Sequence, residues 1–179
     1  DFMLSVIIPA YNEEKCIKTA YNTLNSLLAD NNIDSEFIFV DDGSTDKSIE
    51  IAKKYDVKII KTKHVSVSEA RNIGVKHAKG EYLIFLDSDD YWDKDLLKNL
   101  LKSMDNNPDL IRFQARTVND EGIKNDFNEM EFYNKTGEDA FEIISNFHYV
   151  ESVWIYAIKR SYYLKEKFAF KKGTIHEDF

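Results

Sequence analysis

Apolar residues form short runs along the first hundred residues, and most of these runs are followed by a polar or acidic segment. Short apolar runs bounded by turn residues are typical of strands buried on both faces of a sheet. The sequence predicts four such strands, over 4–8, 36–40, 57–60 and 81–86.

Between these runs, apolar residues recur every three or four positions, which indicates amphipathic helices. The sequence predicts four of them: over about 13–29, from an N-cap at Thr45 or Asp46 to about Tyr55, from Ser68 to a C′ glycine at Gly80, and over about 93–104. Strands that alternate with helices of this length favour an α/β fold with a mostly parallel sheet and helices on both faces.

The alternation weakens after Pro108. The remaining expectations are a strand over 110–118, a polar excursion over 122–135, a helix over 137–147, a strand over 153–158 and a helix from about Arg160. Neither an internal repeat nor a clear linker interrupts the chain, so we expect one domain over residues 3–179.

Charge and composition exclude several classes of protein. The net charge of −8 argues against a nucleic-acid-binding protein, which would normally present a basic surface. Cys16 is the only cysteine, so an intrachain disulfide and a cysteine metal cluster are excluded. The apolar runs are far shorter than the roughly 18 residues of a transmembrane helix, and no signal peptide is visible. We therefore expect a cytoplasmic protein without a transmembrane segment.

Three predicted strands are followed by polar segments whose side chains are of types that bind ligands or take part in catalysis, namely 9–13, 41–44 and 87–90. Ligands of doubly wound sheets bind beyond the carboxyl ends of the strands, so these segments are expected to form one site. The sequence has neither a GxxxxGK[ST] loop nor a GxGxxG fingerprint. A Walker-type NTPase and a Rossmann dehydrogenase are therefore disfavoured.

Asp87 and Asp89 are the most informative of these residues, because two carboxylates one residue apart at a strand end can face a single hard cation. Mg²⁺ and Mn²⁺ prefer such oxygen ligands and keep positions for phosphate oxygens. The alternative is a turn whose aspartates accept hydrogen bonds from backbone amides. The preceding apolar strand and the second acidic strand end favour the metal.

Asp41 and Asp42 have two interpretations. One of them accepts a hydrogen bond from a base imide and so selects uracil, or it caps the following helix, with Gly43 permitting the turn. Arg71 is either a diphosphate clamp or a surface arginine paired with Glu69 or another acid.

The acid pair Glu177 and Asp178 either supplies a general base for an attacking hydroxyl or is an ordinary pair at a helix N-terminus. Tyr11, Trp92 and Trp154 are candidates for the wall of a sugar or base pocket, although most aromatic residues of this chain are expected in the core.

Together these segments resemble the family 2 glycosyltransferases, which have the GT-A fold. The resemblance rests on five segments in the family's order, namely Val6–Glu13, Phe39–Asp46, Ala70–Gly74, Tyr82–Asp90 and Ile175–Phe179. It implies one GT-A catalytic domain, with a nucleotide-binding part over about 3–105 and the start of an acceptor-side part over about 106–179. Family members usually continue past the acid pair, so the resemblance also implies a chain truncated after the catalytic-base motif.

The resemblance also implies roles for individual residues, which group by the part of the substrate they would contact. They are Pro9, Ala10, Tyr11 and Glu13 in the nucleoside pocket, Asp41 or Asp42 on the base, Arg71 and Ser88 on the nucleotide, Asp87 near the ribose or sugar, Asp89 on the metal, and Asp178 as the catalytic base.

The implied function is a metal-dependent inverting transfer of a sugar from a nucleotide diphosphate, with UDP expected, to a saccharide or lipid-linked saccharide acceptor. Mn²⁺ or Mg²⁺ would neutralise the departing diphosphate. At the family level this implies bacterial surface polysaccharide synthesis at the inner face of the membrane. Two alternatives stay open: a nucleotide-sugar-binding module without turnover, and a haloacid-dehalogenase-type phosphatase, whose nucleophile loop Leu86–Asp90 resembles.

Overall fold

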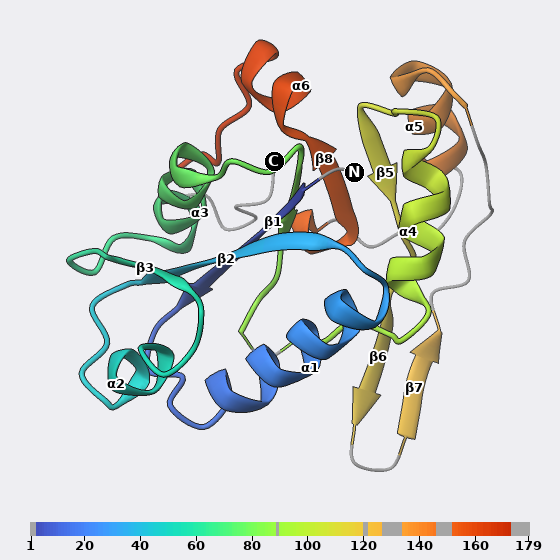
Figure 1. Cartoon of the computed structure of the whole chain (residues 1–179). Helices are drawn as coiled ribbons and strands as arrows, with labels where there is room; N and C mark the ends of the chain where they lie inside the picture. Colours follow the sequence, from blue (N-terminus) through green and yellow to red (C-terminus); the bar gives the residue numbers. More distant parts are fainter. Residues whose placement is uncertain (1–2, 89, 120–121, 127–133, 146–151, 173–179) are drawn as a thin grey trace.

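A central sheet organises the chain (Figure 1). The computed structural model describes residues 3–88, 90–119, 122–126, 134–145 and 152–172. The six strands of the sheet lie in the order β3-β2-β1-β4-β8-β5. Their bounds are β1 Met3–Ala10, β2 Asp34–Asp41, β3 Lys58–Lys61, β4 Tyr82–Phe85, β5 Leu110–Arg112 and β8 Tyr156–Lys159.

Four neighbouring strands, β3, β2, β1 and β4, run parallel, while β8 is antiparallel to both β4 and β5. The register places Ala10 beside Asp41 and Ile7 beside Phe85. The expected mostly parallel sheet is confirmed. The carboxyl ends of β1, β2 and β4 consequently lie side by side at one edge.

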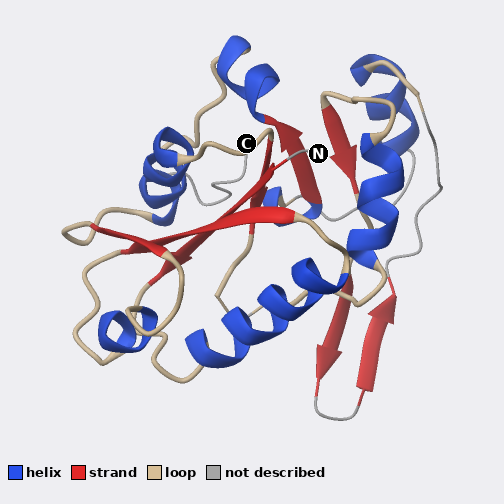
Figure 2. Ribbon diagram, viewed as in Figure 1, coloured by secondary structure: helices blue, strands red, loops and turns tan. Residues whose placement is uncertain are grey.

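Helices cover both faces of this sheet (Figures 1 and 2). Leu4, Val6 and Ile8 of β1 belong to a buried cluster that includes leucines of α1 and α4. Ile7 points the other way, into a second cluster with residues of α3 and Phe170. The helices are α1 Ile17–Asp30, α2 Ser48–Ala52, α3 Val67–His77, α4 Leu96–Met104, α5 Gly137–Ser145 and α6 Arg160–Lys165, with a 3₁₀ turn η1 at Val153–Ile155.

Two helices begin later than the sequence pattern predicts. The amides of Cys16 and Ile17 both donate to the carbonyl of Glu13, so the chain makes a turn before α1 begins. Helix α2 begins at Ser48 rather than after Thr45 or Asp46, and its N-cap position is Lys47. Neither predicted N-cap occupies that position, although Asp46 Oδ1 accepts from the amide of Ser48, the first residue of the helix, over 2.9 Å.

Gly80 is not the C′ glycine of α3, because the helix already ends at His77 and Ala78 is extended. The N-cap is Ser66, whose hydroxyl accepts from the amide of Glu69. A Cβ on Gly80 would lie 2.5 Å from the backbone nitrogen of Ser5. Glycine is therefore required at this position because β1 passes against it.

The second half of the chain differs most from expectation. The strand expected over 110–118 is divided into β5 and a separate strand β6, Arg116–Asn119. The expected polar excursion contains β7, Gly122–Asp126, which pairs antiparallel with β6. The strand expected at 153–158 starts as η1 and becomes β8 only at Tyr156. Helices α5 and α6 are confirmed, although residues 146–147 lie outside the described part.

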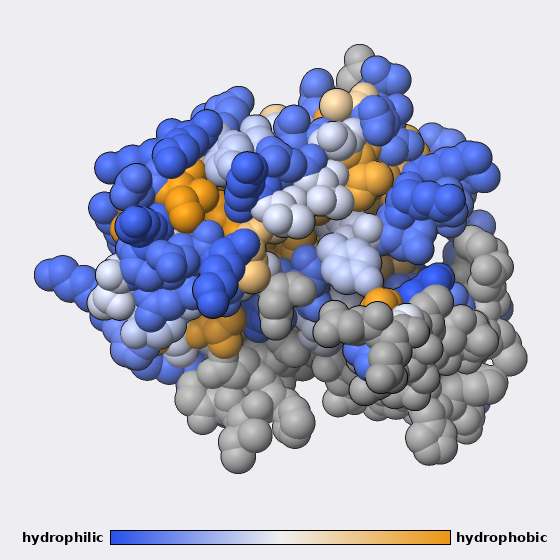
Figure 3. All heavy atoms as spheres, turned by 90° about the horizontal axis from the view of Figure 1, so that it is seen from below, coloured by the Kyte–Doolittle hydropathy of each residue, from blue (hydrophilic) through white to orange (hydrophobic). Residues whose placement is uncertain are grey.

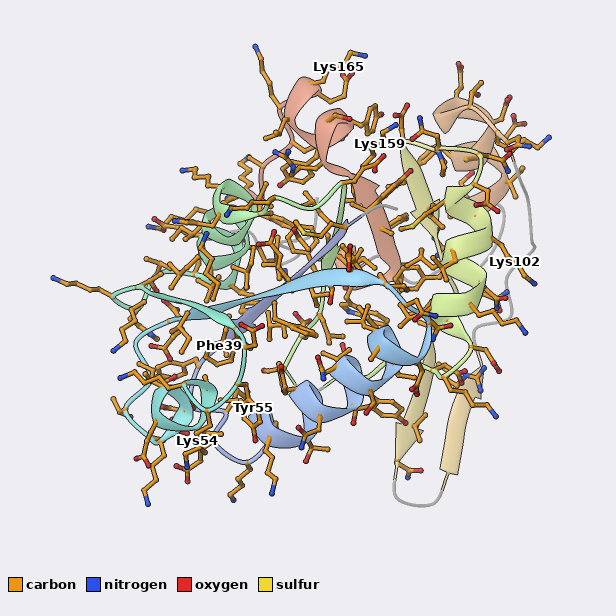
Figure 4. The ribbon with its side chains drawn as sticks, viewed as in Figure 1. Phe39, Lys54, Tyr55, Lys102, Lys159 and Lys165 are labelled. Carbon is orange, nitrogen blue, oxygen red and sulfur yellow. The ribbon has the colours of Figure 1, made fainter. Side chains whose placement is uncertain are left out.

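On the face seen from below, the described residues are mostly hydrophilic, with some apolar residues exposed among them (Figure 3). Lys54, Lys102 and Lys165 lie at the periphery, whereas Phe39 lies among the core elements (Figure 4). No helix in the described part of the chain combines the length and the apolar character that a bilayer crossing requires.

Candidate functional site

The three polar strand ends meet at one edge of the sheet, as the sequence predicts. The amide of Asp42 donates to the carbonyl of Ala10 over 2.9 Å, and the amide of Leu86 donates to the carbonyl of Ile7 over 3.0 Å. The segments that follow β2 and β4 therefore continue along β1 on either side. Pro9 and Ala10 are buried, whereas Tyr11 is 46% exposed.

The consecutive acids at the end of β2 have different environments. Asp41 is 1% exposed, and its Oδ1 is buried without a hydrogen-bond partner among the described residues. Asp42 Oδ1 accepts from the hydroxyl of Thr62 over 2.5 Å and from the amide of Val65 over 2.6 Å. Helix α2 starts six residues after Asp42, at Ser48. The capping interpretation is therefore wrong for both acids.

An aromatic pair lies beside these acids. The ring of His64 is 5.0 Å from the ring of Tyr11, and its Nδ1 is 3.8 Å from Asp42 Oδ2. His64 has a φ of 49°, and Gly43, with a φ of 82°, packs against its backbone. The turn expected at Gly43 is confirmed. Sequence reasoning missed His64, because a single histidine in a polar segment carries no spacing signal.

Asn12 joins the loop after β1 to the loop after β2. Its backbone φ is 57°, and its Oδ1 accepts from the amide of Thr45 over 2.8 Å. The backbone amide of Asn12 donates to Ser44 Oγ over 2.9 Å. Asn12 belongs to the motif that follows β1, but it was not among the predicted site residues. Its role is visible only once the two loops are adjacent.

Further contacts reinforce this junction. The amide of Glu13, which is half-buried, donates to Ser48 Oγ, and the amide of Glu14 donates to Asp46 Oδ2. The amide of Lys47 donates to Glu14 Oε2 in return. Desolvation raises the pKa of Asp46, but hydrogen bonds from Ser48 and Glu14 outweigh it and leave the pKa below its usual value. The contacts of this loop thus favour the ionised form of Asp46.

Arg71 connects α3 to the end of β4. It is 4% exposed, and its Nη2 lies 2.8 Å from Asp87 Oδ1. The expected pairing of Arg71 with an acid is confirmed, and the acid is Asp87. The expected surface position is wrong, and Glu69 is not the partner in this ion pair. Glu69 pairs with Lys172 instead, over 3.2 Å. A buried guanidinium at the sheet edge is suited to bind a phosphate as well as a carboxylate.

Two predicted site residues, Asp89 and Asp178, lie outside the described residues, so their roles stay predictions. Ser88 is half-buried beside Asp87. Within the described ranges, no group of three or more His, Cys, Asp or Glu side chains is arranged to hold a metal ion. Trp92 is 5% exposed and belongs to the core, as expected for most aromatic residues of this chain.

The sequence profile of the family described as Glycosyl transferase family 2 matches residues 5–168. The chain belongs to glycosyltransferase family 2. It is 36% identical over 128 residues to poly(ribitol-phosphate) beta-N-acetylglucosaminyltransferase TarS of Staphylococcus aureus, a match covering 66% of this chain and 22% of TarS. It is 40% identical over 107 residues to UDP-Glc:alpha-D-GlcNAc-diphosphoundecaprenol beta-1,3-glucosyltransferase WfaP of Escherichia coli, covering 58% of this chain and 41% of WfaP.

Solved structures give the same fold to this family 2 chain. The crystal structure of S. aureus TarS 1-349 superposes with a TM-score of 0.75 at 24% identity, covering 98% of this chain and 53% of that one. Its complex with UDP gives 0.74 at 26% identity, covering 94% and 50%. Mannosyltransferase PcManGT from Pyrobaculum calidifontis, in complex with GDP-Man and Mn²⁺, gives 0.64 at 19%, covering 98% and 49%. The fold is therefore GT-A, and the phosphatase alternative has no support.

Proposed function

We propose that this chain binds a UDP-sugar at the edge formed by β1, β2 and β4, and transfers the sugar to an acceptor hydroxyl. The observation that carries the proposal is Asp41 Oδ1, a buried acceptor without a partner among the described residues at the end of β2. A buried polar atom normally has a hydrogen-bond partner, and an unpaired one at a ligand-binding edge is suited to receive a ligand donor. The imide N–H of uracil is such a donor.

Tyr11 and His64 supply the apolar wall that a base also needs. Their rings are in contact and exposed beside the two acids, in a position to stack on a planar ligand. Structures of the neighbour TarS were solved with UDP and with UDP-GlcNAc, which supports uracil as the base.

The diphosphate is proposed to bind Arg71 and a metal ion that Asp89 holds. Arg71 is held in place by its ion pair with Asp87, and its buried guanidinium places a positive charge at the edge of the sheet where we propose that the diphosphate binds. Because Asp87 is already neutralised by Arg71, the metal is assigned to Asp89. Mn²⁺ or Mg²⁺ bound there would neutralise charge on the departing diphosphate. A carboxylate is a suitable ligand for either ion.

Asp178 is proposed as the base that takes the proton of the acceptor hydroxyl. A base placed opposite the leaving group implies inversion at the anomeric carbon. The named relatives act on poly(ribitol-phosphate) and on a diphosphoundecaprenol-linked sugar. We therefore propose a saccharide or lipid-linked saccharide acceptor in bacterial surface polysaccharide synthesis, at the inner face of the membrane.

A thermal-unfolding panel with UDP and UDP-sugars, with and without Mn²⁺, tests the donor site. At a concentration of about 100 times the Kd, UDP with Mn²⁺ should add about 2.7 kcal/mol to the free energy of unfolding. Asp41→Asn should weaken UDP binding about 10- to 100-fold, because the acceptor loses its charge and one of its oxygens is replaced by an NH₂ donor. Asp30→Ala, at an exposed aspartate that ends α1, is the matched control and should leave binding unchanged.

Asp89→Ala tests the metal. It should remove the part of the UDP affinity that depends on Mn²⁺ and leave the remainder. Slow release of UDP from a UDP-sugar in the presence of metal would support turnover. Metal-dependent UDP binding with no release of any sugar would favour the binding-module alternative. No binding of UDP by the parent protein would contradict the proposed function itself.

A further inference from the structure

Asn72 of α3 holds one residue that lies 98 positions later in the chain. Its Nδ2 donates to the carbonyl of Phe170 over 2.9 Å, and its Oδ1 accepts from the amide of Phe170 over 3.0 Å. One side chain thus satisfies both backbone groups of Phe170, as a neighbouring strand would. The position of residue 170 is consequently fixed relative to α3.

Two further side chains of the same helix extend this contact. Ser68, which is fully buried, donates through its hydroxyl to the carbonyl of Lys171 over 3.3 Å. Glu69 forms the ion pair with Lys172. Three successive residues, 170–172, are therefore held by one turn of α3.

The same turn of α3 also contacts the proposed diphosphate side. Arg71 is adjacent to Asn72, forms the ion pair with Asp87, and lies with its Cζ 5.5 Å from the centre of the Phe170 ring. The Phe170 ring in turn packs edge-on against Phe85 of β4, with centroids 5.0 Å apart. Phe170 is thus packed against both Arg71 and the strand that leads to Asp87.

We infer that Ser68–Asn72 couples the diphosphate site to the segment 170–172, and that Asn72 is a positioning residue for that segment. The inference rests on the proposed function. The motif Ile175–Phe179 begins three residues after Lys172. The segment that Asn72 holds therefore leads, along the sequence, into the motif that carries the proposed base Asp178. A phosphate that binds Arg71 would therefore contact a guanidinium that packs against the ring of Phe170, the residue whose backbone Asn72 holds.

Hydrogen–deuterium exchange of peptides covering 168–172 tests the coupling. In the parent protein, UDP with Mn²⁺ should slow exchange there about tenfold. Asn72→Ala should raise the exchange rate of the free protein about tenfold and abolish the effect of UDP, while the Kd for UDP changes by less than about threefold. Asn25→Ala, at an exposed asparagine of α1, is the matched control and should behave like the parent.

Asn72→Asp provides a second variant, because it keeps the acceptor for the amide of Phe170 but places a carboxylate oxygen against its carbonyl in place of the donor. Its exchange rate should exceed that of the parent, and it carries the test if the alanine variant does not fold. In UDP-sugar hydrolysis, Asn72→Ala should lower kcat about 10- to 100-fold with little change in KM.

Two results would overturn the coupling: exchange at 168–172 that UDP changes equally in the parent and in Asn72→Ala, or loss of UDP binding in Asn72→Ala as severe as in Arg71→Ala. A parent protein that binds no UDP would contradict the proposed function, and the coupling with it.

Discussion

Asp41 and Asp42 are consecutive, yet their carboxylates have opposite surroundings. Asp42 is bound by a hydroxyl and an amide from the segment after β3, so its role includes holding that segment in place. Asp41 is more deeply buried, and its Oδ1 has no partner among the described residues. Asp42 therefore stabilises the fold, whereas the buried Asp41 lowers its stability, and a ligand that donates to Asp41 would remove that loss.

This contrast predicts opposite effects of two isosteric substitutions. Asp42→Asn should lower the free energy of unfolding by about 1–3 kcal/mol, because Val65 or Thr62 loses its charged acceptor. Asp41→Asn should leave the stability unchanged or raise it, because a buried charge is removed. Urea unfolding of both variants and the parent measures the difference. Equal losses in the two variants would mean that Asp41 also has a structural partner.

Residues at strand ends could be predicted, whereas their partners could not. The apolar runs determine where the strands stop, and the acids at 41–42 and 87 follow directly from that pattern. The ion pair of Arg71 with Asp87 and the contact of Asn72 with Phe170 depend on how α3 lies on the sheet. A single sequence carries no signal for such contacts.

At the scale of elements, the errors have two physical causes. Gly80 was assigned to a helix end because glycine is common there, but close packing against β1 explains it better. The pairing of β6 with β7 is absent from the sequence-based expectation because their residues are mostly polar and show no alternation of apolar and polar positions. The first four strands were predicted correctly because each is apolar and bounded by turn residues.

The packing of Gly80 predicts a large effect for a single methyl group. In Gly80→Ala, the Cβ would meet the backbone nitrogen and Oγ of Ser5 and the carbonyl of Met3, all within 2.8 Å. Since backbone atoms cannot move aside cheaply, we expect a loss of about 3 kcal/mol or more in the free energy of unfolding.

Gly137→Ala is the matched control, because nothing lies within 4 Å of a Cβ at this first residue of α5. It should be neutral or stabilise by up to about 1 kcal/mol. Chemical denaturation of both variants makes the comparison. A Gly80→Ala variant as stable as the parent would contradict the close approach of β1.

At the scale of the whole molecule, the sheet separates two cores that each bury a tyrosine. Tyr82 belongs to the cluster with α1 and α4, and its hydroxyl donates to the carbonyl of Pro108 over 2.8 Å. Tyr163 belongs to the cluster with α3. Burial raises the pKa of each hydroxyl to about 12, and the charges of Glu81 and Asp109 contribute to the shift of Tyr82. Each core therefore favours an un-ionised phenol.

These shifts predict that the folded chain loses stability at alkaline pH, because the core on each face of the sheet buries one of the two phenols. Below pH 10, both phenols are protonated in the folded and unfolded states, so they add no pH dependence. From about pH 10 to about pH 12 the unfolded chain releases protons that the folded chain retains, so the free energy of unfolding falls. Urea unfolding across this range measures the slope. Tyr163→Phe should make it shallower, whereas Tyr91→Phe, at a 64% exposed side chain, should not. An unchanged slope in Tyr163→Phe would mean that this phenol ionises without unfolding its core.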